Sequence, residues 1–224
     1  MSALALARTV ALLDGRARRD LAALWRRMES AAQASDALHD ILPALIDTYG
    51  SAASTAAAQW YDGLRAKAGA PGGFTAIPAD IKETGAHALV GWALSTATDD
   101  STFKSLIEGG MQRRISNFSR ATVAGSSVAD PSSVGWKRIG AGACEFCQML
   151  ISRDQLYTEA SADFASHDHC NCQAYPLIKG AEPIDTKDYV QSARNSQKPG
   201  ESDAAYEKRR AADRARVRDY IATH

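Results

Sequence analysis

The chain has 224 residues, of which 45% are apolar and 7% aromatic, and its formal net charge is zero. This length suits one medium domain with an appendage or two small domains, and the apolar fraction is sufficient for a buried core. A neutral chain has no overall basic field to attract nucleic acid, so any contact with DNA has to come from a local patch.

Apolar residues that recur at helical spacing predict two N-terminal helical stretches. Residues 3–30 form the first. A second helix begins at a cap supplied by Ser35 or Asp36, is interrupted at Gly50, and continues as an alanine-rich helix over 52–68. The apolar runs are shorter than the roughly 20 residues of a membrane span, and no signal peptide is recognised, so we expect synthesis and retention in the cytoplasm.

A run of glycine and proline at 69–73 ends this first helical stretch. Helices are predicted over 78–96 and over 102–123, the second preceded by aspartate and serine residues that can act as N-caps. Gly109 and Gly110 weaken the middle of the second helix by about 1 kcal/mol each relative to alanine.

The character of the sequence changes after Ala124, where a linker rich in glycine and serine is followed by a predicted strand over 134–139. Residues 140–176 are rich in turns and contain every cysteine of the chain. The last stretch, 203–221, is charged and compatible with a helix.

All four cysteines lie between positions 144 and 172, in the pattern C-x-x-C, about 19 intervening positions, and then H-D-H-C-N-C. Disulfides are uncommon in a reducing compartment, whereas a C-x-x-C turn presents two sulfur atoms toward one point, as zinc sites require. The sequence therefore predicts a structural zinc ion. The candidate ligands are Cys144, Cys147, His167, Cys170 and Cys172.

Structural zinc takes four ligands, and more candidates than four are present. The preferred set is Cys144, Cys147, His167 and Cys170. Cys172 can replace Cys170 if the last segment is extended, since residues two apart in a strand face the same way. His169 is the weakest candidate. Buried metal-free cysteines, a disulfide and a catalytic zinc with an open position are the alternatives.

These elements predict a mainly α protein with three parts. Residues 1–124 form a helical domain, and residues 125–180 form a small α+β zinc-knuckle module with short strands. Residues 181–224 form a polar linker and a charged C-terminal helix. The basic tail residues are candidates for a partner or DNA contact, although pairing with nearby acidic residues explains them equally well. They are Arg209, Arg210, Arg214, Arg216 and Arg218.

The four tryptophans lie within apolar patterns and are expected in the core, while an exposed one would mark a partner surface. They are Trp25, Trp60, Trp92 and Trp136.

The segment from 142 to 150, followed by Tyr157, the H-D-H-C-N-C run and Pro176, resembles the signature block of phage Mu F-like (MuF) minor head proteins. The preceding 135–138 is similar to the lead-in strand of that family. The helical region before it resembles the N-terminal part of MuF-like proteins, so the resemblance extends to about Leu177.

The resemblance implies a non-enzymatic minor capsid protein of a tailed phage, located inside the head near the portal after assembly in the host cytoplasm. It implies roles in head assembly and in DNA packaging or ejection. The implied partners are the portal protein, the major capsid or scaffold protein and packaged DNA, with no membrane and no small-molecule substrate.

A zinc-stapled nuclease of the HNH type is the second hypothesis, because His167-Asp168-His169 after a C-x-x-C turn is loosely similar to that class. Such an enzyme needs a histidine base and a second, catalytic divalent ion beside a ββα element. The sequence predicts neither a second strand nor a downstream catalytic helix. A zinc-knuckle binder of nucleic acid ranks last, because the knuckle is acidic and would repel phosphate.

Overall fold

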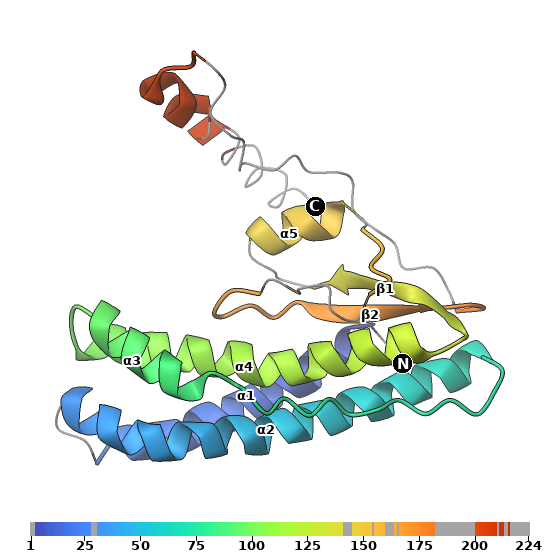
Figure 1. The fold of residues 1–224 in the computed structure, drawn as a ribbon, viewed down its shortest axis with the longest axis horizontal. Coiled ribbons are helices and arrows are strands. Elements are labelled where there is room, and N and C mark those ends of the chain that lie inside the picture. The colour runs from blue at the N-terminus through green and yellow to red at the C-terminus, as the bar shows by residue number, and fades with distance from the viewer. Residues whose placement is uncertain are drawn as a thin grey trace.

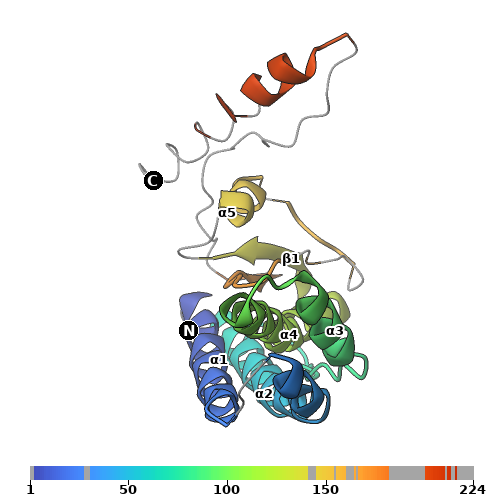
Figure 2. The same cartoon turned by 90° about the vertical axis from the view of Figure 1, so that its left-hand side faces the viewer.

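The computed structural model describes residues 3–27, 31–140, 145–153, 155–159, 164, 166–181, 200–209, 211–212 and 215. Its described part is mainly helical, as the sequence predicts. Four helices form a bundle, a two-stranded sheet covers one side of it, and a short helix lies on the outer side of the sheet (Figure 1). A side view shows α4 of the bundle next to the sheet (Figure 2).

The first two helices are α1, Ala3–Trp25, and α2, Ala31–Ala68. The predicted cap at Ser35 or Asp36 is wrong, because both residues lie inside α2. The predicted interruption at Gly50 is also wrong, since α2 continues through it.

Gly50 has a packing role instead of a helix-breaking one. A Cβ atom at this position would lie 2.5 Å from the ring of Phe118, which comes from α4 and is 1% exposed. The missing side chain therefore lets α2 and α4 approach closely, and this contact compensates for the low helix propensity of glycine.

The predicted helix over 78–96 is only half correct, because α3 covers Ala86–Thr96. Its first part belongs to an irregular segment whose backbone groups bond to helix side chains. Ala76 N–H donates to Asp62 Oδ1 at 2.8 Å, and Ala79 N–H donates to Thr122 Oγ1 at 2.9 Å. These bonds satisfy the backbone without a helical turn.

The long helix α4, Asp100–Ala129, begins at the predicted N-cap Asp99, whose Oδ1 accepts from Thr102 N–H at 2.7 Å. It ends beyond the predicted residue 123. Ser126 and Ser127, expected in a loop, lie in its last turns with buried hydroxyl groups. Ser127 Oγ donates to Gly135 O at 2.6 Å and so joins the helix end to the strand that follows.

A buried ion pair fixes the end of α4 against α2. Arg65 Nε lies 2.6 Å from Asp130 Oδ2, and the Asp130 side chain is 0% exposed. The Tyr61 hydroxyl donates to the same carboxylate oxygen at 3.1 Å. Burial, followed by the nearby Asp130 charge, raises the pKa of Tyr61 above its ordinary value.

The predicted strand is present as β1, Ser133–Ile139, and it pairs antiparallel with β2, Gln173–Ile178. The short strands predicted for residues 125–180 are therefore present, although the sequence did not locate the second of them. Between them lies α5, Glu145–Ser152, so the order is strand, helix, strand and not the ββα order of the nuclease hypothesis. Trp136 of β1 is 1% exposed and belongs to the same buried cluster as the bundle helices.

Three of the four tryptophans are buried as predicted, whereas Trp92 of α3 is 47% exposed. Within the described residues, no helix is both long and apolar enough to cross a lipid bilayer. In the tail, residues 203–209 are helical, and Arg209 forms an ion pair with Glu201 at 2.7 Å.

Candidate metal centre

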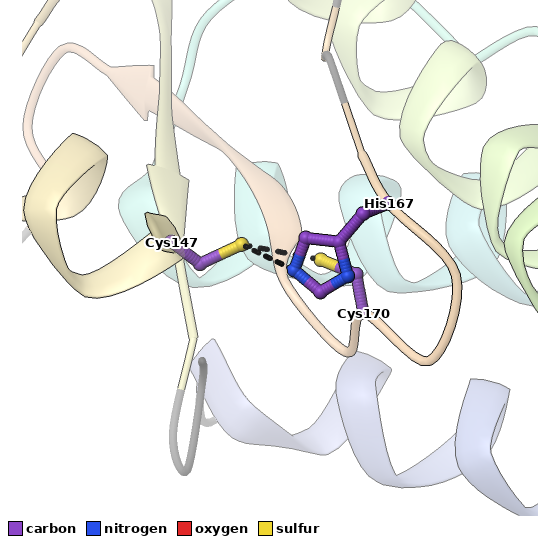
Figure 3. Close-up of side chains that lie close together, drawn as sticks. All are labelled: Cys147, His167 and Cys170. Carbon is purple, nitrogen blue, oxygen red and sulfur yellow. Dashed lines mark hydrogen bonds between the residues drawn. The ribbon is translucent and has the colours of Figure 1, made fainter. Parts of the chain in front are cut away.

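Three of the predicted ligands converge: Cys147, His167 and Cys170, here called the Cys/His cluster. Cys147 lies in the first turn of α5, while His167 and Cys170 lie in the loop that leads into β2. Cys147 Sγ is 3.3 Å from Cys170 Sγ and 3.9 Å from His167 Nε2. Figure 3 shows the three side chains turned toward one another from these two segments.

The geometry and chemistry of the cluster fit zinc. The three donor atoms all lie within 4.8 Å of one another. Zinc–sulfur bonds of about 2.3 Å and zinc–nitrogen bonds of about 2.0 Å place neighbouring ligands roughly 3.5–3.8 Å apart in a tetrahedron. The observed distances differ from these by a few tenths of an ångström, which small side-chain shifts can supply. Thiolate and imidazole together are the ligand types that zinc favours over hard cations.

Cys172 lies close to this cluster and completes a set of three interacting thiols. It is 0% exposed, and its thiol interacts with those of both Cys147 and Cys170. Cys144, which the sequence places in the preferred ligand set, lies outside the described residues. A fourth ligand can therefore come from Cys172, as the alternative set allows.

Protons are shared unequally among the three thiols. The pKa of Cys170 lies below its ordinary value, chiefly because Cys147 and Cys172 donate hydrogen bonds to its sulfur. The pKa of Cys147 is raised, because its thiol keeps the proton that it donates and is desolvated. A metal ion binds the thiolate form of cysteine, so a bound cation would favour deprotonation of these thiols.

The loop that carries two of these ligands is anchored to α4 by Arg120. Its Nη2 donates to Cys170 O at 2.7 Å, and its Nε donates to Cys172 O at 2.9 Å. Burial lowers the pKa of Arg120 to about 10, so the group stays positively charged at neutral pH. The fork of the guanidinium group thus fixes the backbone on both sides of Asn171.

A glycine of α4 allows the same loop to approach the helix. A Cβ on Gly109 would lie 2.6 Å from His169 Nε2 and 3.0 Å from Asp168 Cβ. His169 itself has a φ of 62°, the left-handed conformation that a turn imposes on its third residue. Gly109, which the sequence marks as a weak point of the helix, is therefore where the loop that carries His167 and Cys170 packs against α4.

A polar network links the loop to α1. Gln112 Nε2 donates to Asn171 Oδ1 at 2.7 Å, and Arg18 Nη2 donates to Gln112 Oε1 at 3.0 Å. Arg18 also pairs with Asp14 at 2.9 Å, while the second carboxylate oxygen of Asp14 is buried without a partner in the described part of the chain. Burial raises the pKa of Asp14, and Arg18 opposes that effect.

A groove of about 630 Å³ lies beside the cluster. Trp92 of α3, Arg113 of α4 and two loop residues, His167 and Asp168, line part of it. Arg113 Nε is 3.3 Å from Asp168 Oδ1. One wall of this groove is therefore built by a residue of the Cys/His cluster and its neighbour.

Sequence reasoning missed two residues at this centre, Arg120 and Arg138. Arg138 carried a usable signal, because it lies two positions after Trp136 in a strand and shares its buried face. Of the predicted tail contacts only Arg209 is described; the other four lie outside the described residues. They are Arg210, Arg214, Arg216 and Arg218.

Comparison with known proteins identifies a family. A family model described as VG15 protein, a viral gene-15-type protein, matches residues 2–197. No curated protein and no solved structure matches the chain.

Proposed function

The chain belongs to the VG15 protein family and is thus a viral protein, and from this premise we propose that it is a non-enzymatic minor capsid protein of a tailed phage. In this role it lies inside the head near the portal, after assembly in the host cytoplasm, and contributes to head assembly and to DNA packaging or ejection. The resemblance of its cysteine and histidine pattern to MuF-type head proteins supports this finer assignment.

The observation that carries the proposal is the Cys/His cluster, in which the sulfur atoms are buried and His167 is half-buried. Cys147 and Cys172 are 0% exposed and Cys170 is 3% exposed. Zinc enclosed by protein ligands has no open position for substrate, and such sites stabilise folds rather than catalyse reactions. A structural zinc here holds α5 and the loop before β2 together on the helical bundle.

The exposed face of α3 is the surface that we propose for the portal contact. The helix, Ala86–Thr96, contains no Asp, Glu, Lys or Arg, and Trp92 is exposed on its surface. Exposed tryptophans are frequent anchors of protein interfaces. The arginines of the tail are proposed to contact packaged DNA, and the major capsid or scaffold protein is a further proposed partner.

Virion composition tests the assignment directly. Mass spectrometry of purified particles should detect the protein at a few copies per portal, and particles made without it should package or eject DNA poorly. Full particles that lack the protein and infect normally would contradict the proposal.

Substitution of Trp92 by alanine tests the portal contact. Because the side chain is exposed, the variant should fold as the wild type does, while its binding to purified portal oligomer should weaken by about tenfold or more. Leu12→Ala provides the control, since Leu12 is 70% exposed on α1. Equal losses in both variants, or none in Trp92→Ala, would exclude this surface.

A plasmid-nicking assay with magnesium or manganese separates the structural role from the nuclease hypothesis. We expect the plasmid to stay intact with the wild-type protein. Metal-dependent cleavage that disappears in His169→Ala would instead establish a nuclease.

A further inference from the structure

Two arginines are buried directly beside the sulfur atoms of the Cys/His cluster. Arg120 of α4 is 2% exposed, and Arg138 of β1 is 6% exposed. Both guanidinium groups lie over the ring of Phe164, at 4.8 Å and 3.8 Å from its centroid. A buried guanidinium loses its hydration, so its charge requires acceptors or a negative partner nearby.

Nearby acceptors satisfy the hydrogen-bond donors of Arg120, but they satisfy only some of the donors of Arg138. Arg120 donates to the carbonyl groups of Cys170 and Cys172, and to Asn117 Oδ1 at 2.9 Å. Arg138 Nη2 donates to Phe164 O, and its Nη1 lies 3.9 Å from Cys147 Sγ. Its Nε is buried with no acceptor in the described part of the chain.

The negative partners of these arginines are sulfur atoms and not carboxylates. No ion pair joins Arg120 or Arg138 to an acidic side chain among the described residues. Arg120 interacts electrostatically with all three described cysteines, and Arg138 interacts with Cys172. Two buried positive charges therefore face one group of thiols.

A metal–thiolate centre supplies the missing negative charge. A divalent ion bound by three thiolates and one imidazole carries one net negative charge, and one bound by four thiolates carries two. Neutral thiols supply none. The donors described here, three thiolates and the imidazole of His167, would give the centre one net negative charge facing the two arginines, and they suit a soft divalent ion such as zinc.

On the basis of the zinc centre proposed above, we propose that Arg120 and Arg138 balance the charge of a zinc–thiolate centre and that Arg120 positions its ligands. Arg120 does both because one guanidinium holds the backbone of Cys170 and Cys172 while its charge faces their sulfur atoms. Partners that orient metal ligands in this way typically contribute 10–100-fold to metal affinity.

Zinc affinity, measured on the full chain by competition with a chromophoric chelator, tests this inference. Arg120→Met should weaken zinc binding by about 10–100-fold, and Arg120→Lys, which keeps the charge but not the fork, should lie between it and the wild type. If Arg120→Met fails to fold, the zinc affinity of Arg138→Met tests the charge effect. This substitution removes a buried positive charge and leaves the hydrogen bonds of Arg120 to the loop backbone in place.

Arg114→Met is the matched control. Arg114 also lies on α4 and donates to three backbone carbonyl groups, those of Thr84, Gly85 and Gly110, but among the described residues no hydrogen bond joins it to a cysteine. The control should bind zinc within about twofold of the wild type. Arg120→Met and Arg114→Met variants with equal zinc affinity would overturn the inference.

Cobalt substitution gives a readout that a purely structural role of Arg120 would not change. Removal of a positive charge beside a thiolate raises the energy of its electrons, so the thiolate-to-cobalt absorption band should move to longer wavelength in Arg120→Met and stay in place in Arg120→Lys. An unshifted band in Arg120→Met contradicts the charge-balancing role. Wild-type protein that binds neither zinc nor cobalt would instead refute the metal centre itself.

Discussion

At the scale of residues, small side chains and buried charges decide how the segments meet. Gly50 admits the ring of Phe118, and Gly109 admits the loop at Asp168 and His169. Both glycines have a low helix propensity, and yet both lie inside helices in the structure. The sequence shows that a glycine is present at each position, but it does not show the side chain that packs against it, because that side chain comes from a distant segment of the chain.

Gly50→Ala should lower the free energy of unfolding by about 1–3 kcal/mol, because the new methyl group meets the buried ring of Phe118 and overpacks the core. Gly125→Ala in α4 should instead raise it by up to about 1 kcal/mol, since nothing lies within 4 Å of its new Cβ. Urea unfolding of both variants tests whether the free energy of unfolding changes in these opposite directions. Stabilisation by Gly50→Ala would contradict the proposed close approach.

Asp130→Ala should destabilise the protein by about 3–5 kcal/mol, because it leaves the buried guanidinium of Arg65 without its ion partner. Asp80→Ala is the control, since Asp80 and Lys82 form an ion pair that is exposed to solvent. It should produce no measurable change in a denaturant titration. Similar losses in the two variants would show that burial of the Arg65–Asp130 pair is unimportant.

At the scale of elements, the sequence predicted the helices and the strand that depend on interactions between residues close in the sequence. The helical spacing, the Asp99 cap and the alternating strand with Trp136 are found as expected. The segment 78–85 was predicted as helix, but hydrogen bonds from α2 and α4 hold it in an irregular conformation. Strand β2 was missed because it pairs with a strand far away in the sequence, which periodicity alone does not reveal.

The hydrogen bond between Tyr61 of α2 and Asp130 at the end of α4 predicts that the free energy of unfolding falls at alkaline pH. The pKa of Tyr61 is raised in the folded protein, first by burial, so folding favours the neutral phenol. This contribution is complete below the unfolded pKa of about 10 and is lost as pH rises above it. The free energy of unfolding should therefore fall more steeply above about pH 10 in the wild type than in Tyr61→Phe. Parallel slopes would contradict this assignment.

At the scale of the whole molecule, the Cys/His cluster brings α5 and the loop before β2 together, and Arg120 joins that loop to the helical bundle. The convergence of Cys147, His167 and Cys170 was predicted from the spacing of the cysteines and histidines, which is typical of zinc sites. The sequence did not predict Arg120, which anchors the loop to α4. Zinc binding should therefore stabilise the bundle as well as the loop, since the two are connected through this arginine.

Metal content of the purified protein tests the central claim most directly. We expect one zinc ion per chain in the wild type, and little or none in Cys147→Ser, His167→Ala or Cys170→Ser. His87→Ala, outside the cluster, should keep its zinc. Chelation should lower the melting temperature of the wild type and leave that of Cys147→Ser unchanged. Wild-type protein without zinc, or equal zinc in the wild type and Cys147→Ser, would contradict the account.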